Sequence, residues 1–283
     1  MAVIAFPNID PVLIEIGPIA IRWYSLSYVA GLLGAWWFIL RMVRSERLWT
    51  GLPFNGKASA TPDHVGDLFL WVALGVMLGG RFGYILFYGL IYEWDKYAAE
   101  PWKVLYAWEG GMSFHGGAIG VILAVILFAR AKKLDVVAIG DLVCVAQPIG
   151  QFFGRLANFI NGELWGKPSS VPWAMVFPHA DGQPRHPSQL YEAALEGIVL
   201  FAILVFLVYR FDALKRPGLC TAVFFVGYGI FRMIIESFFR DSSLQMVGPI
   251  SMGTTLSLLM LAFGGFFFWY SLYRKGPALL QTR

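Results

Sequence analysis

Seven apolar stretches, each about long enough to cross a bilayer, constrain this chain more than any other feature. A transmembrane helix needs about 20 mostly apolar residues, and the candidates are Trp23–Leu40, Val65–Tyr88, Gly116–Ala129, Val136–Ile160, Leu190–Tyr209, Gly218–Phe239 and Ile250–Tyr273. The third stretch is short, and we expect its helix to begin nearer Phe114. Only 14% of the residues are charged, against about a quarter in soluble domains. The sequence therefore predicts an all-α integral membrane protein, a bundle of about seven transmembrane helices with small elements outside the membrane.

No linker or repeat divides the chain, so we expect residues 1–283 to form a single polytopic membrane domain with a short insertion at about residues 161–189. Asp10, Glu15 and several prolines in the first 22 residues are atypical of a signal peptide, and we expect that segment to stay at the membrane interface. Cys144 and Cys220 lack CxxC spacing and His-rich surroundings, which disfavours a disulfide framework or zinc site.

Basic residues divide unequally between the two sides that the seven spans define. One side carries thirteen of them: Arg41, Arg44, Arg47, Lys57, Arg130, Lys132, Lys133, Arg210, Lys215, Arg216, Arg274, Lys275 and Arg283. The other side carries six: Arg22, Lys96, Lys103, Lys167, Arg185 and Arg240. Because cytoplasmic loops are enriched in Lys and Arg, we expect the first side to be cytoplasmic and the amino terminus to be outside. The isoelectric point near 9.0 then reflects loop topology, and no nucleic-acid partner is expected.

The remaining three arginines, Arg81, Arg155 and Arg232, fall inside the spans, which is costly for a charged side chain. Each lies late in a span that runs outward, and His115 lies at the outer entrance of the third span. Any one arginine could be an ion-pair strut. Four such groups in the outer half of the membrane favour a functional site.

Three motifs carry polar residues that could build this site. In GRLANFINGELWG, Arg155 and Asn158 share a helix face, whereas Asn161, Gly162 and Glu163 resemble a helix end. In GGMSFHGG, His115 is either an interfacial residue with satisfied hydrogen bonds or a proton-transfer group. In GYGIFRMIIESFFR, Tyr228, Arg232 and Glu236 are spaced four apart, so Arg232 and Glu236 could also simply neutralise each other.

A fourth segment, RHPSQLYEAALEG, opens the fifth span, and we interpret it mainly as a helix start. Ser188 is the expected cap, with Glu192 near the first turn. Aromatic residues at Trp23, Trp94, Trp102, Trp108, Trp165 and Trp173 fit interfacial belts. Tyr24, at the start of an apolar span, is a candidate ligand contact.

Buried arginines at headgroup depth favour an anionic ligand, and a phospholipid phosphate is the anion available there. The sequence contains no Walker motif and no GxSG-like serine element, which disfavours nucleotide hydrolysis and a covalent acyl-enzyme. The residues thus predict a site toward the outer leaflet that handles a phospholipid, with a histidine for proton transfer.

The same motifs, together with RWYSLSY and ISMG, closely resemble the bacterial phosphatidylglycerol:prolipoprotein diacylglyceryl transferase family over nearly the whole chain. The resemblance implies transfer of an sn-1,2-diacylglyceryl group from phosphatidylglycerol to the lipobox cysteine thiol of a preprolipoprotein, with release of glycerol 1-phosphate. It implies a multi-pass protein of the bacterial inner membrane, with a periplasmic amino terminus, a cytoplasmic carboxyl terminus and small periplasmic elements that include the insertion.

The resemblance also assigns roles to residues that this sequence retains. The expected catalytic residues are His115, Arg155 and Arg232, and the expected substrate-binding residues are Tyr24, Arg155, Asn158, Glu163, Tyr228, Arg232 and Glu236. The arginines can stabilise charge on the leaving phosphate, so no metal or cofactor is expected. The alternatives are a transporter or flippase for anionic lipids, which predicts charge across the full membrane depth, and a structural membrane scaffold.

Overall fold

The computed structural model describes residues 4–7, 9–17, 19–51, 54, 56–106, 110–241, 246–247 and 250–274. Trp108, Lys275 and Arg283 of the sequence analysis lie outside these residues. Seven helical segments are long and apolar enough to cross a membrane, which confirms the predicted all-α membrane protein. They are α1 (Trp23–Val43), α3 with η1 and α4 (Pro62–Tyr92), α6 (Phe114–Ala131), α7 (Val136–Ile160), α8 with η4 and α9 (Ser188–Phe211), α10 (Leu219–Phe238) and α11 (Met252–Tyr273).

The third span begins at Phe114, as expected from the sequence, and the fourth has the predicted bounds. The second is longer than expected because a π-helical turn, η1 (Ile85–Gly89), carries the helix on into α4 (Leu90–Tyr92). The fifth contains a second π-helical segment, η4 (Ala193–Val199), between α8 (Ser188–Glu192) and α9 (Leu200–Phe211). Such insertions in a helix often occur at functional sites.

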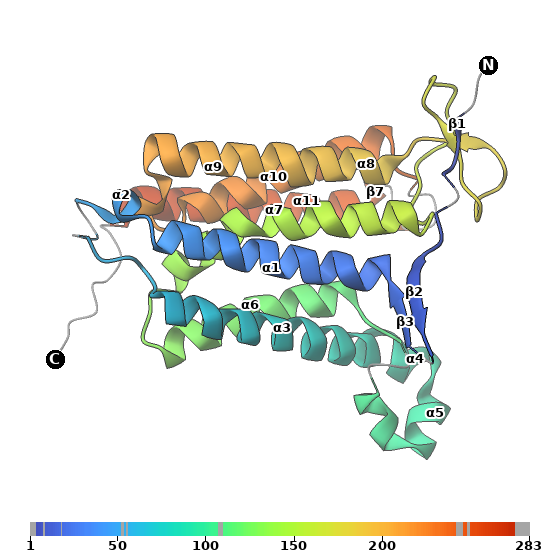
Figure 1. Ribbon diagram of the computed structural model, residues 1–283, viewed down its shortest axis with the longest axis horizontal. Coiled ribbons are helices and arrows are strands. Elements are labelled where there is room, and N and C mark those ends of the chain that lie inside the picture. Colours follow the sequence, from blue (N-terminus) through green and yellow to red (C-terminus); the bar gives the residue numbers. More distant parts are fainter. Residues whose placement is uncertain are drawn as a thin grey trace.

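Short elements lie at the two ends of the bundle (Figure 1). One end carries the hairpin of β2 (Val12–Ile16) and β3 (Ile19–Arg22), the helix α5 (Trp94–Ala99), and a small sheet in the order β1-β4-β5. The strands of that sheet are β1 (Ile4–Ala5), β4 (Met175–Val176) and β5 (Pro184–Arg185). The helix α2 (Glu46–Trp49) lies at the opposite end of the bundle. The other short elements of the described chain are β6 (Met246–Val247), β7 (Ile250–Ser251), η2 (Pro101–Leu105) and η5 (Ala213–Lys215).

Close helix contacts depend on glycine at two places. The helices α3 and α6 approach so closely that a Cβ on Gly79 would lie 2.7 Å from the Cα of Gly120. Between α1 and α7, a Cβ on Gly31 would lie 2.9 Å from the Cα of Gly150. These small residues let helix backbones meet, as is common for helices packed in membranes.

The described apolar core is densest toward the α2 end. Phe128, Leu142, Leu204 and Trp49 are almost fully buried there, and the Trp49 indole donates to the Met42 carbonyl at 3.0 Å. The same end has a buried acid: the Asp141 carboxylate accepts from the backbone amides of Gly218 and Thr221, each at 2.7 Å. Asp141 therefore holds the start of α10, and it satisfies helix amides that would otherwise be unpaired.

Candidate active site

A buried cluster of arginines and glutamates lies where α7 and α10 end and α8 begins. At its centre is Glu192 of α8, whose side chain is 0% exposed. Glu192 Oε2 accepts a hydrogen bond from Arg232 Nη1 at 3.0 Å, and Oε1 accepts one from Arg240 Nη1 at 3.0 Å. Arg155 Nε lies 2.7 Å from Glu192 Oε2, as an ion pair without hydrogen-bond alignment. One carboxylate thus joins arginines from three segments, and we call the whole cluster the Glu192 network.

One branch of the Glu192 network runs along the end of α7. Arg155 Nη1 donates to Asn158 Oδ1 at 3.5 Å, and Asn158 Nδ2 donates to Glu163 Oε1 at 2.7 Å. The helix ends at Ile160, and Gly162 follows with a positive φ of 64°, so the chain turns and brings Glu163 back to Asn158. The motif of the sequence analysis is therefore both a helix end and a hydrogen-bonded chain.

A second branch runs along the end of α10. Arg232 Nη2 lies 3.0 Å from Glu236 Oε2, and Arg240 Nε lies 3.8 Å from the same oxygen. The first turn of α11 packs its backbone against this carboxylate: a Cβ on Gly253 would lie 2.5 Å from Glu236 Cδ. Any larger side chain at Gly253 would displace Glu236.

A third branch lies one turn farther along the fifth span. Gln151 Nε2 donates to Glu196 Oε2 at 2.6 Å and to the Tyr228 hydroxyl at 3.3 Å. Glu196 is farther from the arginines than Glu192, with contacts of 3.8 Å to Arg155 and 4.0 Å to Arg232. Tyr228 thereby joins the network through the Gln151 amide and also interacts with Arg155.

Around Glu192 the network pairs equal numbers of arginines and glutamates, and Glu163 is a fourth carboxylate at the end of the first branch. Three guanidinium groups, from Arg155, Arg232 and Arg240, face three carboxylates, from Glu192, Glu196 and Glu236. The Glu192 and Glu196 side chains are 0% exposed, whereas those of Arg155 and Arg232 are 15% and 13% exposed. Both terminal nitrogens of Arg232 contact carboxylates, but each guanidinium carries five N–H donors, so donors that the carboxylates leave free can bind an anion.

Arg81 does not belong to this network, although the sequence grouped it with the other intramembrane arginines. Its guanidinium donates to backbone carbonyls of the loop before α6, at 2.8 Å to Val104, 2.7 Å to Gly110 and 3.3 Å to Gly111. The residue is buried, and it fixes the loop that leads to Ser113 and the start of α6. Arg81 is therefore a structural strut, but one held by backbone carbonyls rather than by the ion pair that the sequence analysis offered as the alternative.

His115 and Tyr24 lie on neighbouring helices rather than inside the hydrogen-bonded network. His115 is exposed in the first turn of α6 and has an edge contact with Phe114, with ring centroids 5.8 Å apart. The Tyr24 hydroxyl, in the first turn of α1, lies 3.4 Å from that of Tyr28. No hydrogen bond or ion pair joins either residue to Arg155 or Arg232 within the described part of the chain.

Residues 161–187 lie over the end of α10 and are attached to the chain there by a backbone hydrogen bond and an ion pair. Lys167 N donates to the Phe239 carbonyl at 2.8 Å, and Arg185 Nη1 donates to Asp241 Oδ2 at 2.9 Å. Two further hydrogen bonds from Arg185, at 3.0 and 2.8 Å, lower the pKa of Asp181 to about 2. This pair stays ionised at neutral pH.

The start of the fifth span corrects one sequence-based expectation. Pro187 precedes α8, and no side chain caps the helix; Ser188 instead donates to the Leu164 carbonyl at 3.0 Å. The expected Ser188 cap is wrong because this hydroxyl instead forms its hydrogen bond with the segment that follows α7. Glu192, which we expected only as an acid near the first turn, is buried and contacts three arginines.

Sequence reasoning missed four members of the network. The signal for Glu192 and Glu196 was present: two carboxylates four residues apart share a helix face inside an apolar span, which is costly unless they are paired. Arg240 was counted as a loop charge, and Gln151 carried no signal at all. Among the described residues, no group of three or more His, Cys, Asp or Glu side chains could hold a metal ion.

Comparisons with known proteins agree with the resemblance in the sequence. The model of a family described as prolipoprotein diacylglyceryl transferase matches residues 11–270. The chain is 49% identical over 268 residues to the phosphatidylglycerol–prolipoprotein diacylglyceryl transferase of Sinorhizobium medicae, covering 93% of this chain and 92% of the relative. It is 51% identical over 257 residues to the enzyme of the same name from Rhodospirillum rubrum, covering 90% of this chain and 88% of the relative.

Proposed function

The chain belongs to the prolipoprotein diacylglyceryl transferase family, and on this premise we propose that the Glu192 network is its active site. The enzyme transfers the sn-1,2-diacylglyceryl group of phosphatidylglycerol to a prolipoprotein and releases glycerol 1-phosphate. The observation that carries the site proposal is the pair of arginines, Arg155 and Arg232, held on one buried carboxylate, with side chains that are 15% and 13% exposed. Such a pair can bind a phosphate with two guanidinium forks.

In the proposed reaction, the thiol of the lipobox cysteine attacks the glyceryl carbon that carries the phosphate oxygen. The carbon–sulfur bond forms as the carbon–oxygen bond breaks, and the electron pair of that bond stays on the departing phosphate. Arg155 and Arg232 stabilise this negative charge, as preorganised donors do in other enzymes. The reaction uses no metal or cofactor, because the two guanidinium groups supply the positive charge.

His115 is the proposed base for the thiol proton. A cysteine thiol has a pKa near 8.5, so a base is needed at neutral pH. The exposed position of His115, in the first turn of α6, lets it approach a bound substrate without first breaking a contact of the network. Tyr24, Asn158, Glu163, Tyr228 and Glu236 are proposed to contact the substrates.

The proposed location is the bacterial inner membrane, with a periplasmic amino terminus and a cytoplasmic carboxyl terminus. The count of thirteen basic residues against six supports this orientation. In it, the Glu192 network lies at the level of the outer leaflet, and residues 161–189 form a short periplasmic insertion in a single polytopic domain.

The test is incubation of the purified protein with phosphatidylglycerol and a lipobox peptide, followed by mass spectrometry of the peptide. We expect the peptide to gain one diacylglyceryl group. Arg155→Lys and Arg232→Lys keep the charge but lose the fork, so each should lower the rate by about 100-fold. The matched control is Arg130→Lys, which changes an exposed arginine at the far end of α6 and should not change the rate. Full activity of both network variants would overturn the assignment of the site.

A further inference from the structure

A second feature lies at the other end of the bundle, where α1 ends. A cavity of about 500 Å³ is lined by six neighbouring residues: Trp36, Trp37, Leu40, Arg41, Arg44 and Ser45. We call it the α1 groove. The helix α2 that follows it lies at the end of the bundle away from β2, β3 and α8 (Figure 1). The groove is therefore separate from the Glu192 network.

The lining of the α1 groove combines positive charge with indole rings. Arg41 and Arg44 are three residues apart and share a helix face, and the Arg41 guanidinium carbon lies 5.7 Å from the centre of the Trp37 ring. Trp37 is 56% exposed, like many apolar side chains on the outside of this bundle, so its ring is accessible to a lipid. No carboxylate lines the groove.

Basic residues at this end fall into two groups: some have a carboxylate or carbonyl partner, whereas Arg41 and Arg44, like Arg130 and Lys133, have no side-chain hydrogen bond or ion pair among the described residues. Lys132 pairs with Asp67 at 2.6 Å, Lys215 pairs with Asp212 at 3.0 Å, and Arg47 donates to the Tyr209 carbonyl at 2.8 Å. For Arg41 and Arg44, in contrast, no guanidinium hydrogen bond or ion pair is present within the described ranges. Like charges three residues apart repel each other, so a bound anion would stabilise them.

We propose that the α1 groove binds an anionic phospholipid of the leaflet opposite the active site. Arg41 and Arg44 bind its phosphate, and Trp36, Trp37 and Leu40 contact the glycerol and the upper acyl chain. Tryptophan is common at this depth of the membrane, and basic pockets at the cytoplasmic face bind anionic headgroups. The favourable interaction of basic residues with a helix C-terminus accounts for Arg41 in the last turn and for Arg44 at the C-cap, but not for the indole rings that line the groove beside them.

Charge also argues against residues 275–283 as the occupant of the groove. The carboxyl-terminal residues, KGPALLQTR, include Lys275 and Arg283 and have no acidic side chain. A basic segment of this kind does not complement two arginines. A phospholipid phosphate complements them in charge and is present at the ends of all membrane helices.

The experiment is photocrosslinking of the full-length protein in nanodiscs that contain a photoactivatable phosphatidic acid, with the label located by mass spectrometry. Phosphatidic acid carries the phosphate without the glycerol headgroup of the proposed substrate. We expect labelling of residues 36–45 in the wild type. Arg41→Gln with Arg44→Gln should reduce apparent affinity by about fivefold for each arginine, or about 25-fold together. The lysine pair at the same positions should retain most of the labelling.

The matched control is Arg130→Gln with Arg210→Gln, which removes two exposed charges from the same end of the bundle but outside the groove. It should label like the wild type. The groove glutamine variant should also keep its transferase activity in detergent, which shows that it is folded. The proposal is overturned if the groove variant and the control variant lose labelling equally, or if neither loses it. It is also overturned if the lysine pair labels no better than the glutamine pair. Equally strong labelling by photoactivatable phosphatidylcholine, or competition by inorganic phosphate at equal concentration, would overturn it as well.

Discussion

Glu192 shows how one residue can decide the arrangement of a buried site. Its two oxygens contact arginines from α7, α10 and the segment after α10, and each contact is 3.0 Å or shorter. Removing one partner of a buried ion pair costs about 3–5 kcal/mol, because the other charge stays buried without compensation. Without Glu192, Arg155 keeps only a 3.8 Å contact to Glu196 among the described carboxylates, and Arg232 and Arg240 share Glu236, so we expect Glu192 to contribute to folding as well as to the proposed site.

The first prediction compares Glu192→Gln with Glu196→Gln. Glu192→Gln should lower the transferase rate by about 100-fold or more and lower the melting temperature, because Arg155, Arg232 and Arg240 lose their shared carboxylate. Glu196→Gln should have a smaller effect, since its arginine contacts are 3.8 and 4.0 Å. Rates by mass spectrometry and melting in detergent measure both effects. Equal losses in the two variants would contradict the central position of Glu192.

The second prediction concerns the proton of the substrate thiol. His115→Gln keeps hydrogen-bonding capacity but cannot take a proton, so lipid binding should persist while transfer slows at neutral pH. The deficit should shrink as the pH rises past about 8.5, where the thiol ionises without help. Rates across this pH range measure it, and the exposed His179→Gln should match the wild type throughout. A deficit that does not change with pH would make Glu163 and Glu236 the next candidates for the base.

At the residue scale, the sequence predicted the site residues of α7 and α10 but not the glutamates of the fifth span. Charged residues inside apolar spans drew attention to Arg155, Arg232 and Glu236, and the structure joins these three through direct contacts or through Glu192. Glu192 was interpreted as part of a helix start because its distance from Arg155 along the chain hides their contact in space. Pairing between helices depends on tertiary packing, which one sequence does not give.

At the element scale, the approach of α3 to α6 decides where the first turn of α6, which contains His115, lies. Gly79 and Gly120 let the two backbones meet, and the loop before α6 is fixed to α3 by Arg81 and by the bond from Ser113 N to the Gly80 carbonyl at 2.9 Å. A change in the spacing of α3 and α6 would therefore move the first turn of α6. His115 would move with it.

The third prediction uses two glycines of the same helix. A Cβ on Gly79 would lie 2.7 Å from the Cα of Gly120, whereas nothing lies within 4 Å of a Cβ on Gly66. Gly79→Ala should push α6 away, lower the melting temperature and reduce transfer. Gly66→Ala should leave both unchanged or raise stability slightly, because alanine favours a helix by about 1 kcal/mol over glycine. Loss of activity in both variants would argue against the close approach of α3 and α6 as the cause.

The helices themselves were predictable because their signal is local. Length and hydropathy located all seven spans to within a few residues. The longest departure is at the second span, where η1 and α4 carry the helix on to Tyr92. The π-helical segments and the tertiary contacts of Ser188 depend on neighbouring helices, so no local pattern revealed them.

At the scale of the whole molecule, the proposed mechanism takes the reacting thiol from the substrate and not from the enzyme. Cys144 and Cys220 are free cysteines, and Cys220 is fully buried in the apolar core. The Glu192 network lies elsewhere, at the ends of α7 and α10. The fourth prediction is that Cys144→Ala with Cys220→Ala keeps most of the transfer activity of correctly inserted protein. Complete loss of transfer with normal melting would indicate a covalent enzyme intermediate.

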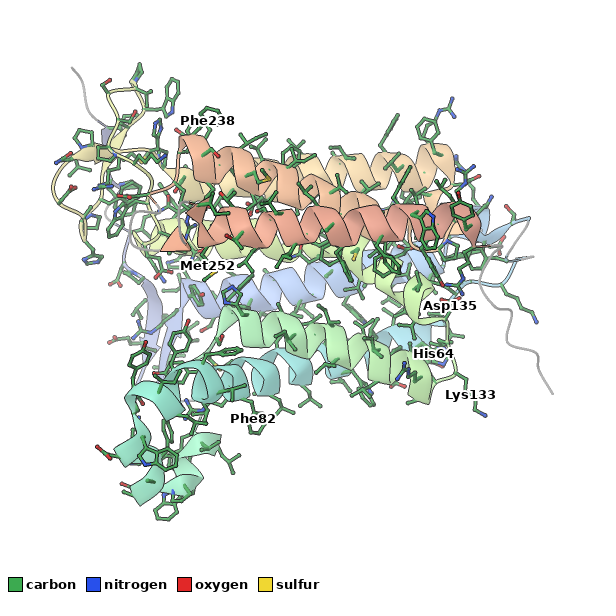
Figure 2. All side chains as sticks on the ribbon, turned by 180° about the vertical axis from the view of Figure 1, so that it is seen from behind. His64, Phe82, Lys133, Asp135, Phe238 and Met252 are labelled. Carbon is green, nitrogen blue, oxygen red and sulfur yellow. The ribbon has the colours of Figure 1, made fainter. Side chains whose placement is uncertain are left out.

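The orientation of the whole bundle gives the fifth prediction. Figure 2 shows Lys133 near Asp135 and His64 at one end, and Phe238 near Met252 at the other. The Glu192 network lies at the end of the bundle that contains Phe238, because Arg232 and Glu236 belong to the last turns of α10, which ends at Phe238. Basic residues concentrate at the end of Lys133, which we expect to face the cytoplasm.

Reporter fusions after Lys133 and after Arg216 should therefore give a cytoplasmic signal, and a fusion near Pro178 should give a periplasmic signal. These three positions lie in connections between spans, so a fusion there interrupts no transmembrane helix. Changing Lys132 and Lys133 to Gln should leave the orientation intact, because most of the thirteen basic residues remain on that side. A periplasmic signal after Lys133, together with a cytoplasmic signal near Pro178, would place the Glu192 network at the cytoplasmic leaflet. In that case the charge distribution would not set the topology, and the α1 groove would face the periplasm.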